Sequence, residues 1–440
     1  MTIAVARKMQ KGSLDSITRV LEQELLTAIG CTEPVAIAYC GALAARALGK
    51  RPQSISVRCS GNIIKNAKSV VVPNTLGLKG IEASAISGAL YGDPEKGLEV
   101  LSSITPEQAG DIAEKIGRLR VPVSLLHTKH LLHIIVACHA GEDTAEAEIC
   151  GSHTHIAAIR LNGVTQYAGG EFSQQVPGHE EKLSVIKILT YAKQVPLEEI
   201  RPILIGQIKN NIAIAREGLS GNWGAEIGKT ILAARGNSAR AKLVAWTAAG
   251  SDARMNGCAM PVTINSGSGN QGLAASVPVI IRAEQLKAGE EALLRALAVS
   301  NLIAIHQKRG IGRLSAYCGA VTAAIGSAAG IAYLEGAGGE QIEQVISNGL
   351  MIASGMLCDG AKSSCAAKIV TSLDSALLAY DMSKSGREFQ PGEGLAKPGV
   401  EGTISAVARV AREGMKETDI QILHVMLDNP NNELEADNRF

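Results

Sequence analysis

HIIVACHAGEDTAEAEICGSHTHIAAIRLNG, residues 133–163, decides the fold class of the first part of the chain. Residues 131–138, 145–150 and 156–162 are short runs rich in apolar and β-branched side chains, and Gly, Asp and Ser separate them. Such runs are typical of strands. The last run ends in Asn162-Gly163, a pair that favours a tight hairpin turn. The stretch therefore predicts a series of short strands.

The segments before this stretch add helices and further strands. Residues 15–48 repeat apolar side chains at helical spacing, with a Gly-Cys-Thr-Glu-Pro interruption at 30–34. Pro34 is tolerated in the first turn of a second helix, because the N–H that it lacks has no intrahelical partner there. Another helix is expected within residues 74–90. Strands are also predicted from runs at residues 54–59, 69–72 and 121–127.

From residue 182 onward the pattern becomes helical, with Gly-rich breaks. The sequence therefore predicts an α+β fold. A mixed α/β portion, residues 1–175, carries the GCTEP motif, and a mainly helical domain, residues 176–440, carries a Gly-rich loop and several cysteines. The helices of that domain are expected at residues 183–195, 210–223, 227–236, 239–250, 290–310, 318–334, 340–356 and 403–415.

The charge balance argues against two classes of partner. The 440 residues include 43 Lys and Arg against 42 Asp and Glu, a net charge of +1, so no basic surface for nucleic acid or acidic lipid is expected. The uncharged stretch 314–334 has the length of a membrane span, but its small residues favour a buried helix of a soluble protein. Because the N-terminus shows no signal-peptide pattern, we expect a cytoplasmic protein that binds neither nucleic acid nor membrane.

Three motifs do not support the functions that they suggest at first sight. GSGNQG, residues 267–272, matches a dinucleotide fingerprint, but the segment after it contains Pro278 and makes a poor helix. A loop whose backbone amides bind some other anion fits better. WGAEIGKT, residues 223–230, has Trp223 where a Walker motif needs Gly. The histidines of residues 127–139 lack Cys or carboxylate partners at metal-site spacing, so we expect them at strand edges.

The cysteines of the helical half form the most informative group. The chain has nine cysteines, an odd number, and no export signal, so disulfides are disfavoured. Cys318, Cys358 and Cys365 occur among small residues, and their spacing lacks the close pairs that zinc sites use. Three thiolates without a fourth suit a cubane iron–sulfur cluster with one open iron, whereas three packed core thiols are the alternative. Spacing alone leaves both open.

Seven motifs together resemble the L-cysteine desulfidase family, which is related to the α-chain of iron–sulfur L-serine dehydratases. The resemblance extends over nearly the whole chain. It rests on GCTEPVAIA, HTHI, SDARMNGCAMPV, SGSGNQG, GRLSAYCGA, GMLCDGAKSSCAAK and GMKETDIQIL.

The resemblance implies that Cys318, Cys358 and Cys365 hold a [4Fe–4S] cluster. The implied reaction is an α,β-elimination that converts L-cysteine to pyruvate, ammonia and hydrogen sulfide, with the open iron as Lewis acid toward the leaving group. L-serine dehydration by the same mechanism is the alternative. The chain departs from its relatives in the closer spacing of Cys358 and Cys365. A second departure is a C-terminal tail without a cysteine that could cap the open iron.

Cys31 and Glu33 are the candidate bases for the α-proton. GCTEP places Cys31 at a helix N-terminus, where a thiolate is stabilised, and the resemblance points to the same cysteine. Glu33 is the alternative base, or a charge partner of the helix end. Candidate substrate-binding residues, each of which could equally serve ordinary turn chemistry, are Thr32, His153, Thr154, Asn265, Ser266, Ser268, Asn270, Gln271 and Lys362.

Two other classes of protein remain as alternatives. A pyridoxal-phosphate enzyme runs the same elimination through a Schiff-base lysine, but neither Lys229 nor Lys362 lies in a convincing context for it. A non-enzymatic metal-binding or redox-sensing protein would use the three cysteines and leave Cys31 without a role. Helices rich in small residues can pack within one chain or across a homodimer, and the sequence leaves this open.

Overall fold

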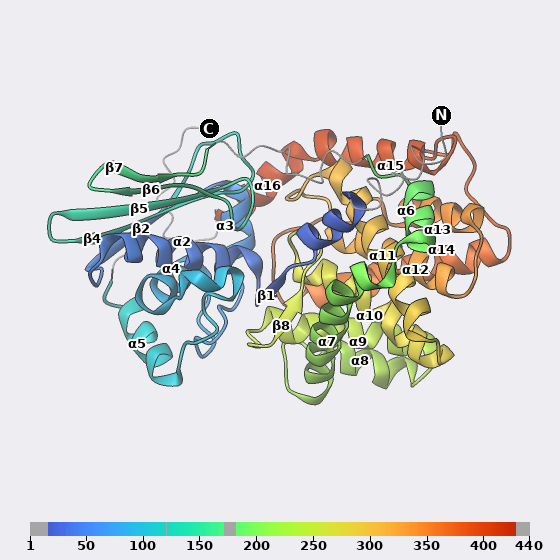
Figure 1. Cartoon of the computed structure of the whole chain (residues 1–440), viewed down its shortest axis with the longest axis horizontal. Coiled ribbons are helices and arrows are strands. Elements are labelled where there is room, and N and C mark those ends of the chain that lie inside the picture. Colours follow the sequence, from blue (N-terminus) through green and yellow to red (C-terminus); the bar gives the residue numbers. More distant parts are fainter. Residues whose placement is uncertain (1–15, 120, 171–181, 428–440) are drawn as a thin grey trace.

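The computed structural model describes residues 16–119, 121–170 and 182–427. It confirms the α+β prediction: Figure 1 shows a sheet with its helices on one side of the molecule and a larger group of helices on the other. The predicted boundary between residues 175 and 176 lies outside the described residues.

The sheet has six strands in the order β3-β2-β4-β5-β6-β7. Only the β2–β3 pair is parallel, and the other pairs are antiparallel. Asn162 and Gly163 have φ angles of 50° and 78°, so the predicted hairpin turn between β6 and β7 is confirmed. The strands are β2 (Ser54–Cys59), β3 (Val123–Leu125), β4 (His133–Ala140), β5 (Asp143–Cys150), β6 (Ile156–Leu161) and β7 (Val164–Ala168).

One face of this sheet is covered by helix α2 (Thr32–Leu48), which packs on β4, β5 and β6. Ile134, Val136 and Cys138 alternate along β4 and are fully buried, as a strand covered on this face requires. The next layer is α4 (Gly80–Tyr91), which crosses α2 so closely that a Cβ at Gly88 would overlap the Ala38 carbonyl group. The remaining helices of this half are α3 (Gly61–Ala67), η1 (Pro94–Glu99) and α5 (Pro106–Ile116).

Two local predictions in this half are wrong. Residues 69–72 make no strand, only an isolated bridge between Val71 and Lys79. The predicted helical stretch 15–48 is interrupted by a strand, β1 (Thr27–Ile29), before α2 begins. Pro34 lies in the first turn of α2, as its missing N–H requires.

Strand β1 joins the two halves of the molecule, because its partner is β8 (Pro261–Thr263) in the helical half. The helical residues 16–24 that precede β1 also lie against that half: Ile17 is buried, and the Thr18 hydroxyl is 2.8 Å from the Tyr191 hydroxyl. The first described helical residues therefore pack on the helical half before the sheet begins (Figure 1).

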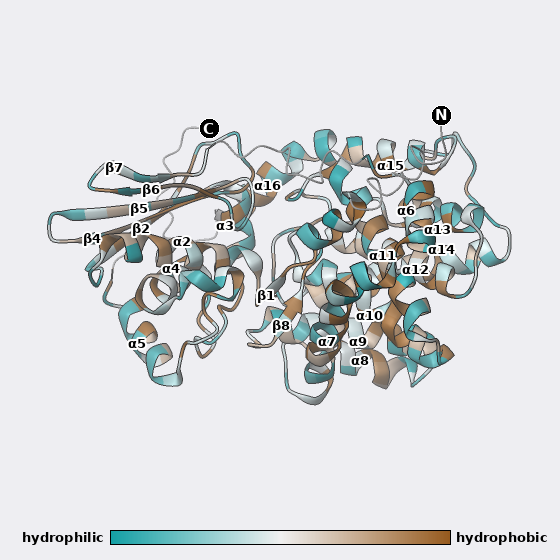
Figure 2. Cartoon of the chain, viewed as in Figure 1, coloured by the Kyte–Doolittle hydropathy of each residue, from teal (hydrophilic) through white to brown (hydrophobic). Residues whose placement is uncertain are grey.

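The C-terminal half is helical, as predicted. The amphipathic helix α15 shows teal and brown turns along one side of the molecule in Figure 2. Its buried side chains include Val400, Ile404 and Val407. The helices are α6 (Val185–Gln194), α7 (Leu197–Ser220), α8 (Ile227–Arg235), α9 (Ala239–Met255), α10 (Gly269–Leu286), α11 (Glu290–Ile311), α12 (Gly319–Leu334), α13 (Gly339–Ala353), α14 (Cys365–Lys384), α15 (Val400–Arg409), η2 (Val410–Gly414) and α16 (Lys416–Leu427).

Helices α10 and α12 are both largely buried. The expectation that the segment after GSGNQG makes a poor helix is wrong, since α10 continues through Pro278 and is buried at every residue from Gln271 to Ile281. Tertiary packing outweighs the lost hydrogen bond at that proline. Helix α12 is the uncharged stretch, and it is buried from Ala320 to Ala332, as expected of a core helix. Within the described part of the chain, no helix combines the length and apolar content of a membrane span.

Candidate functional site

The N-termini of four helices meet at one cavity between the two halves. Cys31 precedes α2, Ser268 precedes α10, Cys318 precedes α12, and α14 begins at Cys365; all four residues line the cavity. It holds ≈ 770 Å³ of empty space, its mouth included. The N-cap residues of these helices are Cys31, Ser268, Cys318 and, for α14, Ser364, and none of their side chains makes a capping hydrogen bond. Free N–H groups and helix dipoles therefore favour negative charge in this cavity.

The three cysteines predicted as cluster ligands all line this cavity. An isolated β-bridge between Tyr317 and Leu357 brings two of them together. Beside it, the N–H of Cys358 donates to the Ala316 carbonyl oxygen at 2.6 Å, and the N–H of Cys318 donates to that of Met356 at 3.0 Å. The fold thus closes the sequence gap between Cys318 and Cys358.

Buried lysines surround the cysteines. Lys308 is 4% exposed and lines the cavity, and Nζ of Lys65, which is 2% exposed, lies 3.4 Å from the carbonyl oxygen of Cys358. A hydrogen bond with Cys318 lowers the pKa of Cys358 despite burial, and the positive charges of the two lysines lower it further. Burial lowers the pKa of Lys308 to about 8. This environment favours a thiolate at Cys358.

Three cysteine thiols at one cavity fit the donor set of a cubane iron–sulfur cluster with one open iron. In the part of the chain that the structure describes, no three His, Cys, Asp or Glu side chains converge on one ion position. Cys318, Cys358 and Cys365 all line the cavity, and the buried Lys308 lines it with them.

Cys31, Glu33 and His153 form a second group on the same cavity. The Cys31 thiol donates to Oε2 of Glu33 at 3.1 Å, and Nε2 of His153 lies 3.8 Å from Oε1. The Thr32 hydroxyl lies 3.0 Å from Oε2 of Glu33 and 2.9 Å from the Gly267 carbonyl oxygen. His153 is 4% exposed, and its Nε2 has no hydrogen-bond partner.

The pKa values of this group differ from the expectation for a helix N-terminus. Burial and the negative charge of Glu33 raise the pKa of Cys31 well above its usual value, although the Arg254 charge opposes this. Burial also raises the pKa of Glu33, but contacts with His153 and Cys31 outweigh it and lower the pKa to about 2. At neutral pH the pair is therefore a thiol and a carboxylate, and the expected thiolate at Cys31 is not favoured here.

The Gly-rich loop lines the cavity beside this group, since the Gly267 carbonyl oxygen accepts a hydrogen bond from the Thr32 hydroxyl. Ser266 and Gly267 have φ angles of 51° and 82°, and Asn265 and Ser268 exchange backbone hydrogen bonds of 3.1 and 3.0 Å. The loop is thereby a tight turn into α10. The residues of the loop that line the cavity are Ser266, Gly267, Ser268, Asn270 and Gln271.

Four predicted binding residues do not line this cavity. Asn265 is fully buried, and its Nδ2 donates to Oδ1 of Asn301 at 3.0 Å. It therefore holds the loop in place and does not face the cavity. Thr32 is occupied with Glu33 and the loop carbonyl. Thr154 is exposed and lines an adjoining outer cavity. Lys362 is turned to the carbonyl oxygens of its own loop, at 3.0 Å from that of Asp359.

Sequence reasoning missed several residues of the cavity. Arg254 and Tyr317 line it, and both lie inside motifs that carried the resemblance, SDARMNGCAMPV and GRLSAYCGA. That position in a motif was the available signal. The other missed polar residues are Asn66, Lys308, Arg313, Ser315 and Lys368.

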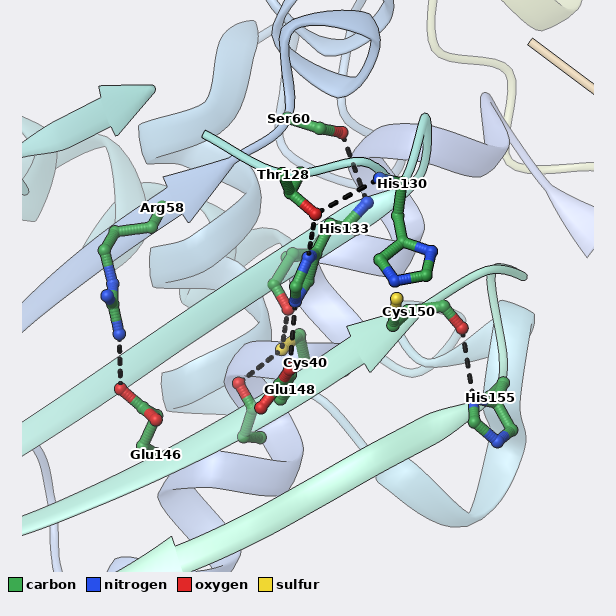
Figure 3. A network of polar contacts seen from close by, with 12 residues as sticks. Cys40, Arg58, Ser60, Thr128, His130, His133, Glu146, Glu148, Cys150 and His155 are labelled. Carbon is green, nitrogen blue, oxygen red and sulfur yellow. Dashed lines mark hydrogen bonds and ion pairs between the residues drawn. The ribbon is translucent and has the colours of Figure 1, made fainter. Parts of the chain in front are cut away.

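The histidine-rich stretch of residues 127–139 lies elsewhere, on the sheet (Figure 3). His133 is held between the Thr128 hydroxyl at 3.0 Å and Oε1 of Glu148 at 2.9 Å. Glu148 also accepts a hydrogen bond from Arg160 at 2.9 Å. These contacts form a structural network of the sheet, and none of its members lines the cavity.

Residues 95–424 match the serine dehydratase alpha chain family, and the chain belongs to that family of hydro-lyase-like enzymes. Within it, the chain is 48% identical to the UPF0597 protein of Lachnoclostridium phytofermentans over 415 residues, which cover 93% of this chain and 98% of that one. The UPF0597 protein of Treponema denticola is 44% identical over 427 residues, covering 95% and 99%. The expected relation to serine dehydratase alpha chains is thus confirmed, whereas these names do not mention cysteine.

Proposed function

We propose that this protein eliminates the β-substituent of a small amino acid, converting L-cysteine to pyruvate, ammonia and hydrogen sulfide. The observation that carries the proposal is the meeting of Cys318, Cys358 and Cys365 with the Cys31–Glu33 pair at one cavity. L-serine is the second candidate substrate, and the name of the family favours it. The two substrates differ in one atom, sulfur or oxygen, of the leaving group.

The cofactor proposed is a [4Fe–4S] cluster held by Cys318, Cys358 and Cys365. When bound, it would supply a Lewis-acidic iron for a thiolate or hydroxide leaving group. The chain itself contributes the buried charge of Lys308, which offsets the negative charge of the thiolates, whereas the charge of Lys65 is already paired with Asp419.

We assign the removal of the α-proton of the substrate to the Cys31–Glu33 pair. Glu33 is ionised at neutral pH, so it is the member of the pair that accepts a proton. Cys31 can act as the base only after its own proton has moved to Oε2 of Glu33, along the 3.1 Å hydrogen bond. His153, 3.8 Å from Oε1, stabilises the negative form of the carboxylate.

The remaining steps require little from the protein. Loss of the α-proton and of the leaving group forms the carbon–carbon double bond of an aminoacrylate. The aminoacrylate tautomerises to an imine, and one water molecule hydrolyses the imine to pyruvate and ammonia. Gln271 Oε1 and the Tyr317 hydroxyl are buried and unpartnered in this structure, and both can hold polar groups of the substrate.

An anaerobic assay of pyruvate release tests the proposal, with L-cysteine and L-serine side by side. Protein reconstituted with iron and sulfide should absorb broadly near the blue edge of the visible range and release pyruvate from at least one substrate. Cys358→Ala should lose both the absorbance and the activity. Cys258→Ala is the matched control, because Cys258 is a free thiol of the same helical half that does not line the cavity.

Three other results would contradict the proposal. Release of pyruvate from neither substrate by reconstituted protein rejects the elimination. A cluster without any turnover supports a redox-sensing protein instead. A sharp aldimine absorbance with bound pyridoxal phosphate would show that the elimination uses a Schiff-base lysine instead of a cluster.

A further inference from the structure

Arg254 is the most deeply buried arginine that the structure places on the cavity. It lies near the end of α9, is 1% exposed and lines the cavity next to Cys31. Its Nη1 contacts Sδ of Met255 at 4.0 Å, while Nε and Nη2 have no hydrogen-bond partner. A buried guanidinium with unpaired N–H groups is strongly disfavoured unless a ligand completes it.

The two unpaired nitrogens define the shape of the missing partner. Nε and Nη2 lie on the same edge of the guanidinium plane, so their N–H bonds point in parallel and match the two oxygens of a carboxylate. This fork lies against the first residue of α10: a Cβ at Gly269 would overlap Nε and would lie 2.7 Å from Cζ. A helix N-terminus and a guanidinium are both positive, so their proximity favours an anion that contacts both.

We propose that Arg254 binds the α-carboxylate of the amino-acid substrate through Nε and Nη2, assisted by the N-terminus of α10. The assignment rests on the proposed function for the identity of the substrate. It makes Arg254 a specificity-determining residue: α-amino acids bind, and their amides do not. It also fixes the orientation of the substrate, with the carboxylate at Arg254 and the α-carbon toward Cys31, which lines the same cavity.

Binding of L-alanine, which has no leaving group, tests this inference without turnover. Calorimetric titration of the reconstituted protein should show binding of L-alanine and none of L-alaninamide. Arg254→Lys keeps the charge but loses the fork, and should weaken L-alanine binding about 10- to 100-fold, the value of one bidentate pair. Gly269→Ala keeps the arginine but displaces it, and should weaken binding to a similar degree.

Arg282→Lys is the control, because Arg282 pairs with Glu335 away from the cavity and should leave binding unchanged. Iron content and the cluster absorbance should stay the same in all three variants. The inference is overturned if Arg254→Lys binds L-alanine as the wild type does, if the wild type binds L-alaninamide equally well, or if it binds neither. Should Arg254→Lys fail to fold, Gly269→Ala decides the question by the same measurement.

The outcomes separate this inference from the proposed function. Arg254-dependent binding of L-alanine without any pyruvate release would reject the elimination and keep the carboxylate site. Pyruvate release with an unchanged KM for L-cysteine in Arg254→Lys would keep the elimination and reject the site.

Discussion

The thiol of Cys31 donates a hydrogen bond of 3.1 Å to Oε2 of Glu33, two residues further along the first turn of α2. Both side chains are buried, and both face the cavity that holds the three clustered cysteines. A thiol paired with a carboxylate in this way can exchange a proton without help from solvent.

Glu33→Gln should therefore abolish proton transfer while leaving the cavity intact. We expect kcat for pyruvate release to fall about 10²- to 10⁴-fold, the usual contribution of a positioned acid–base group. Iron content and visible absorbance should stay at the wild-type level, because Glu33 is not one of the three cysteine ligands proposed for the cluster. An unchanged kcat would exclude Glu33 from the proton transfer.

The close crossing of α2 and α4 predicts that Gly88 tolerates no side chain. Gly88→Ala would drive a Cβ into the Ala38 carbonyl, and we expect a loss of about 1 to 3 kcal/mol or more in unfolding free energy. Urea denaturation measures it. Gly110→Ala, in helix α5 with no atom near its would-be Cβ, should instead be neutral or stabilise by up to about 1 kcal/mol. Equal effects of the two substitutions on the unfolding free energy would contradict the close contact between Gly88 and Ala38.

The network on the sheet predicts a pH-dependent contribution to stability. Burial raises the pKa of Glu148, but its hydrogen bonds to His133 and Arg160 outweigh this and lower the pKa below its usual value (Figure 3). A lowered carboxyl pKa stabilises the fold above the unfolded pKa of about 4.3, and the stabilisation is lost as the pH falls through the folded pKa.

Glu148→Gln should accordingly cost about 1 to 2 kcal/mol at pH 7. The difference from wild type should shrink as the pH falls below about 4. Thermal unfolding at several pH values measures it, with the exposed Glu142→Gln as control. A gap that stays constant with pH would show that the charge of Glu148 contributes nothing.

The amide network behind the Gly-rich loop predicts a link between stability and substrate binding. Asn301 is fully buried and bonds to Gln207 at 2.8 Å and to Asn265 at 3.0 Å. Asn301→Leu leaves the Gln207 amide unpaired and removes the bond from Asn265 Nδ2 to Oδ1 of Asn301, so we expect a loss of about 2 to 5 kcal/mol in unfolding free energy and a raised KM. Asn210→Ala, which removes a part-buried bond to Thr263, should have a smaller effect. An unchanged KM in Asn301→Leu would show that the amide network does not affect substrate binding.

Much of the fold was readable from the sequence where local pattern and tertiary environment agree. Strand β2 was predicted with its observed bounds, Ser54–Cys59, because it alternates between a buried and an open face. Strand β1 has no such signal, since its partner β8 is far away in the sequence. Strand β7 is exposed throughout, so it shows no apolar alternation, and only the turn before it marked its place.

The site was readable in part for similar reasons. The cysteines stand out by chemistry, yet their spacing left packed thiols as an alternative until the fold brought them to one cavity. Arg254 was overlooked, because periodicity arguments place arginine on the surface, whereas here it is buried. The rise in the pKa of Cys31 depends on burial and on Glu33, which a helix-end argument alone does not include.

The residues that line the cavity lie between Cys31 and Ile369 in the sequence and come from both halves of the molecule. Strand β1 can pair only after its partner β8 has been synthesised. A ribosome adds about 5–20 residues per second, so the sheet of the first half can form well before α14 has emerged. Cys31 and Glu33 then remain without the cavity residues Cys318, Cys358 and Cys365 until most of the chain has been made. Any iron–sulfur cofactor must therefore enter after synthesis is nearly complete, and a truncated chain cannot assemble the site.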